Sequence, residues 1–300
     1  MITHKFSREF PMDIKTRVSL CMVFFFLFIS GNAQDCLAAV QGEAGRDVSF
    51  LFDTLSWLLF AAAFTGLLLG GFISRTDPYI DKDRVFRHDF SAKLSHWTHA
   101  GGCILLLVSA VGLGFFFLPR LVPGVSGAAW LMDLHFIGAL FFVFGGFFWA
   151  ANTIISPYRF TEHMPDGGSL IEGLTHYAHI FKLTKKRVRP TKYNGSERLA
   201  FVPIVLVAAL LILTGFIKIL PRMMDIPTAL LGSTTWVHDA LALFMLILFF
   251  FHVLLAAVVP WSWPLLKSMF TGHVPLKFAQ DEHASWVEQL NKKDSTEEKP

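Results

Sequence analysis

Residues 236–261 have the sequence WVHDALALFMLILFFFHVLLAAVVPW. As one helix, this stretch is long and apolar enough to cross the hydrocarbon core of a bilayer, which is about 30 Å thick. It contains His238 and His252. Their spacing on an α-helix places the two side chains about 40° apart around the axis and about 21 Å apart along it. Ionisable residues at membrane depth are costly and usually functional, so we expect one of these imidazoles at a site near each membrane face.

The composition is typical of a membrane protein. The 300 residues include 32 Phe and 8 Trp, whereas only 16% are charged. Soluble domains are rarely so poor in charge, and the apolar residues here fall in long blocks. The cysteines Cys21, Cys36 and Cys103 show no C-x-x-C spacing, so we expect neither an iron–sulfur site nor a disulfide framework.

Five apolar segments are long enough to cross the membrane as helices. We expect them at 54–74, 94–118, 134–158, 199–219 and 238–262. The first contains no histidine and is expected to lie at the periphery, where its GLLLGG sequence would allow close packing on a neighbour. The other four are candidates for a helix bundle.

The distribution of Lys and Arg between these segments predicts the topology. The counts are five in 75–93, one in 119–133, eight in 159–198, one in 220–237 and five in 267–300. Because basic residues are enriched in cytoplasmic loops, the alternation places the C-terminus in the cytoplasm. The last ten residues, NKKDSTEEKP, are charged and are expected to be disordered.

The N-terminus predicts a secretory signal peptide over residues 1–39. A basic segment precedes the apolar run VSLCMVFFFLFIS at 18–30, and small residues follow it up to Ala39. The alternative is an uncleaved anchor helix, although the apolar run is short for a membrane span.

The predicted topology sorts the histidines of the spans by depth. His135 and His238 both begin a span at the periplasmic face, and they form the outer pair. His252 lies near the cytoplasmic face with His96 or His99, which sequence alone does not separate. This distribution predicts two haems, each bound by two imidazoles, stacked inside a four-helix bundle. The alternative for any one histidine is a polar residue that reaches from a span end to the membrane interface.

The remaining histidines fall in loops or in the tail. Polar residues there are solvated by default. We expect this of His88, His163, His176, His179, His273 and His283.

Residues 85–290 resemble the cytochrome b, or gamma, subunit of respiratory formate dehydrogenases. The matching sequences are SHWTHAG at 95–101, DLHFIGA at 133–139, KYNGSERLAF at 192–201, VHDALALFMLILFFFH at 237–252 and TGHVPLKFAQDEHASW at 271–286. The histidines alone would fit the wider group of dihaem cytochromes b.

The resemblance implies a role for particular residues. It implies two b haems, with His96 and His252 as axial ligands on the cytoplasmic side and His135 and His238 on the periplasmic side. The family motif favours His96 over His99. Asn194 matches an asparagine at the quinone site of the family, and Ser196 stands where a quinone-contacting backbone glycine can occur.

The resulting prediction is an all-α membrane protein with a four-helix transmembrane haem bundle and one extra N-terminal transmembrane helix. Its expected parts are a signal peptide at 1–39, the extra helix and a cytoplasmic loop at 40–84, the dihaem domain at 85–290 and a charged tail at 291–300.

The chain would lie in the bacterial inner membrane and pass electrons from a periplasmic iron–sulfur beta subunit through both haems to menaquinone or ubiquinone. Formate oxidation would belong to a molybdenum- or tungsten-containing alpha subunit, because the chain has no motif for these cofactors. The alternatives are the cytochrome b of a hydrogenase or of another quinone-linked oxidoreductase, and a proton-coupled transporter with histidine relays.

Overall fold

The computed structural model describes residues 50–155 and 157–297, and the predicted signal peptide lies outside them. Four helices in this part of the chain are long and apolar enough to cross a membrane. The predicted all-α membrane bundle is thereby confirmed. The four helices are α4 (Phe90–Leu113), α5 (Gly124–Ile155), α8 (Gly195–Ile219) and α9 (Thr228–Val253).

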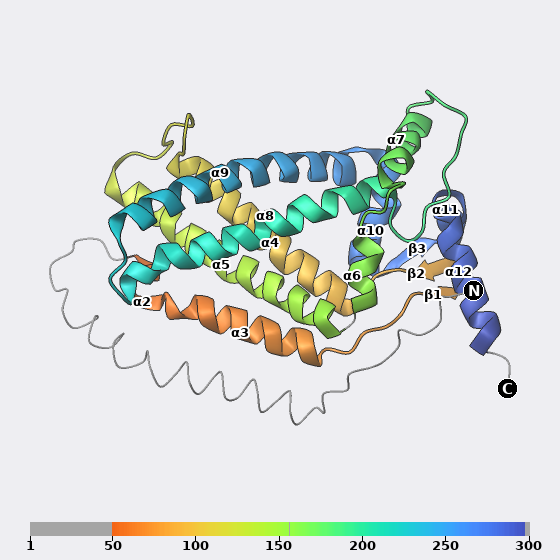
Figure 1. Ribbon diagram of the computed structural model, residues 1–300, viewed down its shortest axis with the longest axis horizontal. Coiled ribbons are helices and arrows are strands. Elements are labelled where there is room, and N and C mark those ends of the chain that lie inside the picture. Colours follow the sequence, from red (N-terminus) through yellow and green to blue (C-terminus); the bar gives the residue numbers. More distant parts are fainter. Residues whose placement is uncertain (1–49, 156, 298–300) are drawn as a thin grey trace. The chain divides into compact units, whose positions relative to one another are not determined.

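The four helices run alongside one another in alternating directions (Figure 1). We call the end of the bundle at which α4 begins and α9 ends the tail end. It carries α6 (Pro157–His163), α7 (Ser169–Ile180) and α10 (Trp263–Thr271), together with the C-terminal helices. A core to which all four helices contribute lies between the two ends and includes Leu107, Phe142, Val207 and Met245.

The helices extend beyond the predicted spans. α9 begins at Thr228, well before the expected residue 238, and α5 begins at Gly124. Apolar residues mark only the part of a helix that lies in the hydrocarbon core. The helix itself continues into the membrane interface until a residue that cannot continue the backbone hydrogen bonding ends it. α4 ends earlier than expected, at Leu113, because Gly114 adopts a positive φ of 78° there.

The extra apolar helix is α3 (Trp57–Phe72), which has 16 residues and is preceded by α2 (Leu51–Leu55). It packs on α5 through the GLLLGG sequence. A Cβ atom at Gly66 would lie 2.5 Å from the Phe144 carbonyl oxygen, and one at Gly70 would lie 2.3 Å from that of Phe148. Only glycine allows two backbones to approach so closely, which confirms the predicted close packing.

The C-terminal segment is folded against a small sheet at the tail end. Strands β1 (Tyr79–Asp81), β2 (Arg84–Phe86) and β3 (His273–Pro275) pair antiparallel in that order. Helices α11 (Leu276–Glu282) and α12 (Ala284–Glu297) follow. Their side chains form a core with Val85 and Val274, which are fully buried.

The expected disorder of the last ten residues is therefore wrong for 291–297. They continue α12, whose earlier residues Trp286, Val287 and Leu290 bury apolar side chains in the core of the tail end. This packing supplies the stability that the charged sequence lacks by itself.

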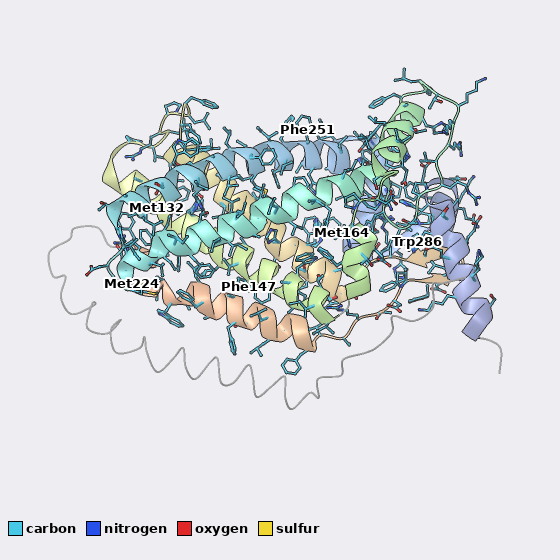
Figure 2. All side chains as sticks on the ribbon, viewed as in Figure 1. Met132, Phe147, Met164, Met224, Phe251 and Trp286 are labelled. Atoms are coloured by element: carbon cyan, nitrogen blue, oxygen red, sulfur yellow. The ribbon has the colours of Figure 1, made fainter. Side chains whose placement is uncertain are left out.

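The outer surface of the bundle is apolar. Phe250 and Phe251 of α9 are 61% and 54% exposed, and Phe251 points away from the other helices (Figure 2). Such side chains match the lipid-facing role that a membrane span requires.

Candidate functional site

His96 and His252 face one another across the bundle at the tail end. His96 is in the second turn of α4 and His252 is the penultimate residue of α9. Their ring centroids are 6.4 Å apart, with 52° between the ring planes. Nδ1 of His96 is buried and has no hydrogen-bond partner among the described residues.

This separation fits two imidazoles on opposite sides of one iron atom. An imidazole nitrogen binds a transition metal at about 2 Å, and the ring centroid lies about 1 Å further away, so two opposed rings would have centroids about 6 Å apart. A bare metal ion needs three or four protein ligands. Across the described residues no group of three or more His, Cys, Asp or Glu side chains is suited to one. A pair of imidazoles alone therefore fits an iron that a macrocycle already holds, as in haem.

His99 is placed differently from His96. It lies one turn further along α4 and stacks on Phe142 of α5, with ring centroids 3.8 Å apart. Its Nδ1 is 3.0 Å from the Phe142 carbonyl oxygen. The structure therefore brings His96 next to His252 and directs His99 into the α4–α5 contact.

His135 and His238 lie at the opposite end of the bundle, on α5 and α9. Each has a hydroxyl beside its Nδ1: Ser109 Oγ is 2.9 Å from that of His135, and Thr214 Oγ1 is 2.7 Å from that of His238. His135 and His238 thus lie at one end of the bundle, and His96 and His252 lie at the other.

The end of α9 is irregular just beyond His252. Residues Leu254–Val258 form a π-helix, and the 3-10 helix Pro260–Ser262 follows. Single π-helical turns inside α-helices are rare and occur frequently at functional sites. His252 itself is exposed, whereas His96 is half-buried.

Asn194 is the N-cap of α8 and is buried. Its side-chain oxygen accepts hydrogen bonds from the Glu197 amide at 2.9 Å and from the Ser196 hydroxyl at 2.6 Å. The Glu197 carboxylate in turn accepts from the Asn194 amide at 2.8 Å, which completes a capping box. The Asn194 side-chain NH₂ has no hydrogen-bond partner among the described residues.

Helix α7 covers the first turn of α8. A Cβ atom at Gly195 would lie 2.1 Å from the Ser169 carbonyl oxygen, and one at Gly173 would lie 2.9 Å from the Ser196 amide nitrogen. The Gly195 amide donates to Glu172 at 2.7 Å. Ser196 therefore presents its backbone amide to α7, at the edge of the region around Asn194.

Three loop and tail histidines are buried, which contradicts their expected solvation. His88, His176 and His283 are 9%, 4% and 1% exposed. Their burial follows from the folded tail, which sequence patterns did not predict. Arg87, itself buried, donates from Nε to His88 Nε2 at 3.2 Å, and its Nη1 lies 3.3 Å from His283 Nε2.

Arg87 joins the tail to the start of α8. Its guanidinium lies over the rings of Tyr193 and Trp286 and pairs with Glu197, the residue of the capping box, at 3.8 Å. Burial and the charge of Arg87 lower the pKa of His283 to about 3, and the same two causes hold the pKa of His88 well below its usual value. Both rings are therefore neutral near pH 7 and can accept hydrogen bonds from the arginine.

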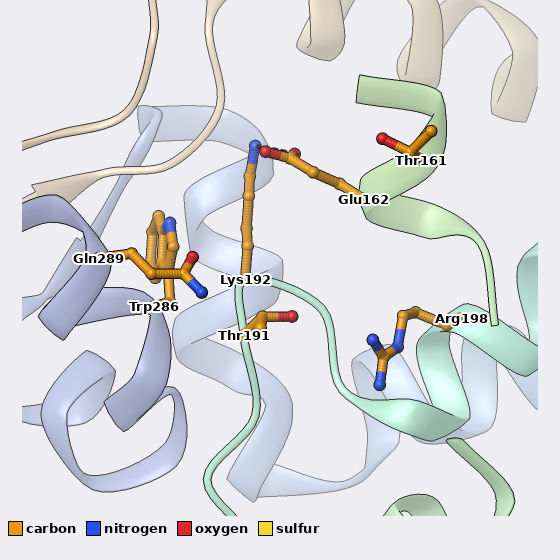
Figure 3. Close-up of a pocket in the computed structure, with 7 residues that line it drawn as sticks. All are labelled: Thr161, Glu162, Thr191, Lys192, Arg198, Trp286 and Gln289. Atoms are coloured by element: carbon orange, nitrogen blue, oxygen red, sulfur yellow. Dashed lines mark ion pairs between the residues drawn. The ribbon is translucent and has the colours of Figure 1, made fainter. Parts of the chain in front are cut away.

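A cavity of about 260 Å³ opens beside this cluster at the tail end. Figure 3 shows the Lys192–Glu162 ion pair at its wall, with a distance of 3.5 Å. The cavity is lined by Thr161, Glu162, Thr191, Lys192, Arg198, Trp286 and Gln289. Because this lining is charged and polar, whereas sites for aromatic ligands are mostly apolar, the cavity is not assigned to a quinone ring.

Comparison with known proteins identifies the family. The family described as prokaryotic cytochrome b561 matches residues 87–272, a range that contains all four paired histidines. The chain belongs to the prokaryotic cytochrome b561 family. This cytochrome b561-type chain is similar to the cytochrome b556(Fdn) subunit of nitrate-inducible formate dehydrogenase from Escherichia coli strain K12, with 22% identity over 216 residues. The match covers 71% of this chain and 95% of the relative, and the Shigella flexneri subunit gives the same values.

These matches confirm the resemblance that the sequence motifs indicate. The chain is a multi-pass membrane cytochrome b, related to a formate dehydrogenase cytochrome subunit, and its family implies haem b. It is an electron-transfer component of a redox enzyme complex.

Proposed function

We propose that this chain is the dihaem, quinone-reducing subunit of a formate dehydrogenase complex. The observation that carries the proposal is the opposition of His96 and His252 at 6.4 Å, together with a second histidine pair at the other end of the same bundle. His238 and His252 stand about 21 Å apart along α9, which gives two separate sites within one membrane thickness.

The four histidines would hold two b haems. His96 and His252 hold the inner haem, and His135 and His238 hold the outer haem. Each haem, when bound, supplies one-electron iron chemistry at its site. The protein fixes where that chemistry occurs: α9 contributes one ligand to each site, α4 the other inner ligand and α5 the other outer ligand.

The tail end is the cytoplasmic end. The loop between α3 and α4, the loop between α5 and α8, and the tail carry most of the basic residues, and all three lie at this end. The C-terminus therefore lies in the cytoplasm, and the helix bundle lies in the inner membrane of a bacterium. Electrons that cross from the outer side to the inner side store about 2.3 kcal/mol per charge at 100 mV.

The quinone would bind between His252 and the start of α8. Asn194 supports this because its oxygen is engaged in the helix cap while its NH₂ group is free, among the described residues, to donate to a quinone carbonyl. The exposure of His252 and the π-helix beside it also favour this end of the bundle as the place where a quinone would bind. Ser196, two residues after Asn194, would also line this site from the first turn of α8.

The partners follow from the relative. Its name places it in a formate dehydrogenase, so we assign to this chain an iron–sulfur subunit as electron donor and a molybdenum- or tungsten-containing subunit as the site of formate oxidation. We place the iron–sulfur donor on the periplasmic side because the outer histidine pair lies at the end of the bundle opposite the tail end.

A reduction experiment with the complex purified in mild detergent tests the proposal. Formate should reduce the haem absorption bands to the same extent as dithionite, and an added quinone should reoxidise them. If dithionite reduces the bands and formate does not, the donor is a different enzyme. Protein identification of the co-purifying subunits then names that donor.

A further inference from the structure

Each histidine of the outer pair contacts a hydroxyl from a neighbouring helix. Ser109 of α4 lies 2.9 Å from Nδ1 of His135 on α5, and Thr214 of α8 lies 2.7 Å from Nδ1 of His238 on α9. Both hydroxyl residues are buried, at 0% and 7% exposure. The same arrangement thus occurs twice, on two separate pairs of helices.

The direction of these two hydrogen bonds follows from the second contact of each hydroxyl. Ser109 Oγ is 2.7 Å from the Leu105 carbonyl oxygen, and Thr214 Oγ1 is 2.8 Å from that of Leu210. A hydroxyl has one proton, and a carbonyl can only accept. The proton therefore goes to the carbonyl of the preceding turn, and the hydroxyl oxygen is left as an acceptor toward the histidine.

The histidine must then supply the proton between the two side chains. Nδ1 of both His135 and His238 carries hydrogen, because an oxygen that has already given away its proton cannot donate a second time. In a neutral imidazole the other nitrogen, Nε2, then has the free lone pair. This is the nitrogen that a metal requires.

We propose that Ser109 and Thr214 are positioning residues for the outer haem: they fix the Nδ1–H tautomer of His135 and His238 and direct Nε2 at the iron. The inference rests on the proposed haem ligation of that pair. A metal-bound imidazole that donates its second N–H to an acceptor is a stronger electron donor to the metal, which favours the oxidised iron. The two hydroxyls therefore lower the reduction potential of the outer haem.

His96 of the inner pair has no such support in the described part of the chain. Nδ1 of His96 is buried without a hydrogen-bond partner. A lower potential at the outer haem than at the inner one favours electron flow from the periplasmic to the cytoplasmic side. The two hydroxyl–histidine contacts thus favour electron transfer in one direction, from the outer haem to the inner haem.

Redox titration of purified variants, followed by the haem absorption bands, tests this role. In Thr214→Val and Ser109→Ala the potential of the outer haem should rise, and that of the inner haem should not change. Loss of an outer-shell partner weakens metal–ligand interaction about tenfold. A tenfold loss that falls on the oxidised iron corresponds to about 59 mV for a one-electron couple. The effect should be larger in Thr214→Val, because the Leu106 carbonyl also contacts the His135 ring and can replace the serine.

Three further variants separate positioning from structure. Thr214→Ser keeps the hydroxyl and should retain the wild-type potential. Thr153→Val removes a hydroxyl that makes the same backbone contact, to Trp149 at 2.8 Å, but faces no paired histidine, so it should leave both potentials unchanged. A His96→Ala background, which leaves only the outer haem, assigns the potential that moves.

The outcomes are distinct. Loss of one haem in Thr214→Val with recovery in Thr214→Ser also supports the role. Two bound haems with unchanged potentials in both Thr214→Val and Ser109→Ala overturn it. A wild-type chain that binds no haem overturns the proposed function instead, so the two failures cannot be confused.

Discussion

The outer and inner histidine pairs differ in how firmly the protein holds them. At the outer pair both rings are half-buried and each Nδ1 has a hydroxyl partner. At the inner pair His252 is exposed, a π-helix begins two residues later, and Nδ1 of His96 lacks a partner in the described structure. Contacts within the protein thus hold both rings of the outer pair, whereas the inner pair lies beside an irregular helix end.

Removing single ligands should separate the two sites with the largest effect. His238→Ala and His252→Ala should each reduce the haem content from about two to about one per chain and abolish quinone reduction by formate. Absorption spectra of the two variants should differ, because each retains a different haem. Identical residual spectra would mean that the pairs are not independent sites.

Asn194→Asp should affect only the inner end. The variant retains the capping oxygen but loses the side-chain donor, and loss of such a hydrogen bond costs about 1.5 kcal/mol or more, so quinone reduction should fall about tenfold or more. Both haems should still assemble and be reduced by formate. Asn291→Asp is the control, since it makes the same change at an exposed position of α12 and should leave quinone reduction normal. Normal quinone turnover in Asn194→Asp, with intact haem spectra, would remove Asn194 from the site.

His96 and His99 should respond differently to the same change. His96→Gln should lose the inner haem. His99→Gln should keep two haems and should only destabilise the α4–α5 contact, by about 1–3 kcal/mol, which is typical when a buried hydrogen bond is disturbed. Haem content and thermal unfolding of the two proteins check this. Loss of a haem in His99→Gln, with normal content in His96→Gln, would exchange their roles.

The sequence predicted the bundle and its histidine pairs because both depend on simple periodicity. Apolar length, basic loops and the helical rise predict that His135 lies at one depth with His238, and His252 at another with His96 or His99. The choice between His96 and His99 needed the angular position of α4 against α5, which the close approach at Gly102 determines: a Cβ atom there would lie 2.4 Å from the Phe142 amide nitrogen. Helix rotation of this kind depends on packing and cannot be obtained from residue spacing.

Two features of the site could not be predicted because they join distant segments. Ser109 and Thr214 stand out in the sequence as hydroxyls inside apolar blocks, but their histidine partners are identified only once the helices are packed. The burial of His283 depends on its contacts with Arg87, which lies 196 residues earlier in the chain, and with the Thr191 carbonyl, which lies 92 residues earlier. The charged tail sequence alone indicated a solvated segment.

Acid should destabilise the folded tail and leave the outer pair unaffected. The pKa of His283 is about 3 in the folded protein, below its usual value, because of burial and the charge of Arg87. The unfolded tail therefore binds a proton below about pH 6.5 that the folded tail does not bind until about pH 3, so its stability falls as the pH drops through that range. The loss at pH 5 is about 2 kcal/mol on this basis. His88 acts in the same direction.

Protease cleavage within α11 and α12, compared near pH 7.5 and near pH 5, measures this effect. His283→Gln should reduce the difference, since glutamine cannot titrate but can still donate to Thr191 and accept from Arg87. His273→Gln, at strand β3, is the matched control and should behave as the wild type. Equal acid sensitivity in His283→Gln and the wild type would show that His283 is not responsible.

The haem content of the purified wild-type protein tests the central claim most directly. A pyridine haemochrome assay, normalised to the amount of chain, should return about two b haems per chain, one for each histidine pair. A value near one would leave only one of the pairs as a ligand set. A value near zero would contradict the account, because it would leave the opposed imidazoles of His96 and His252 without the iron that explains their placement.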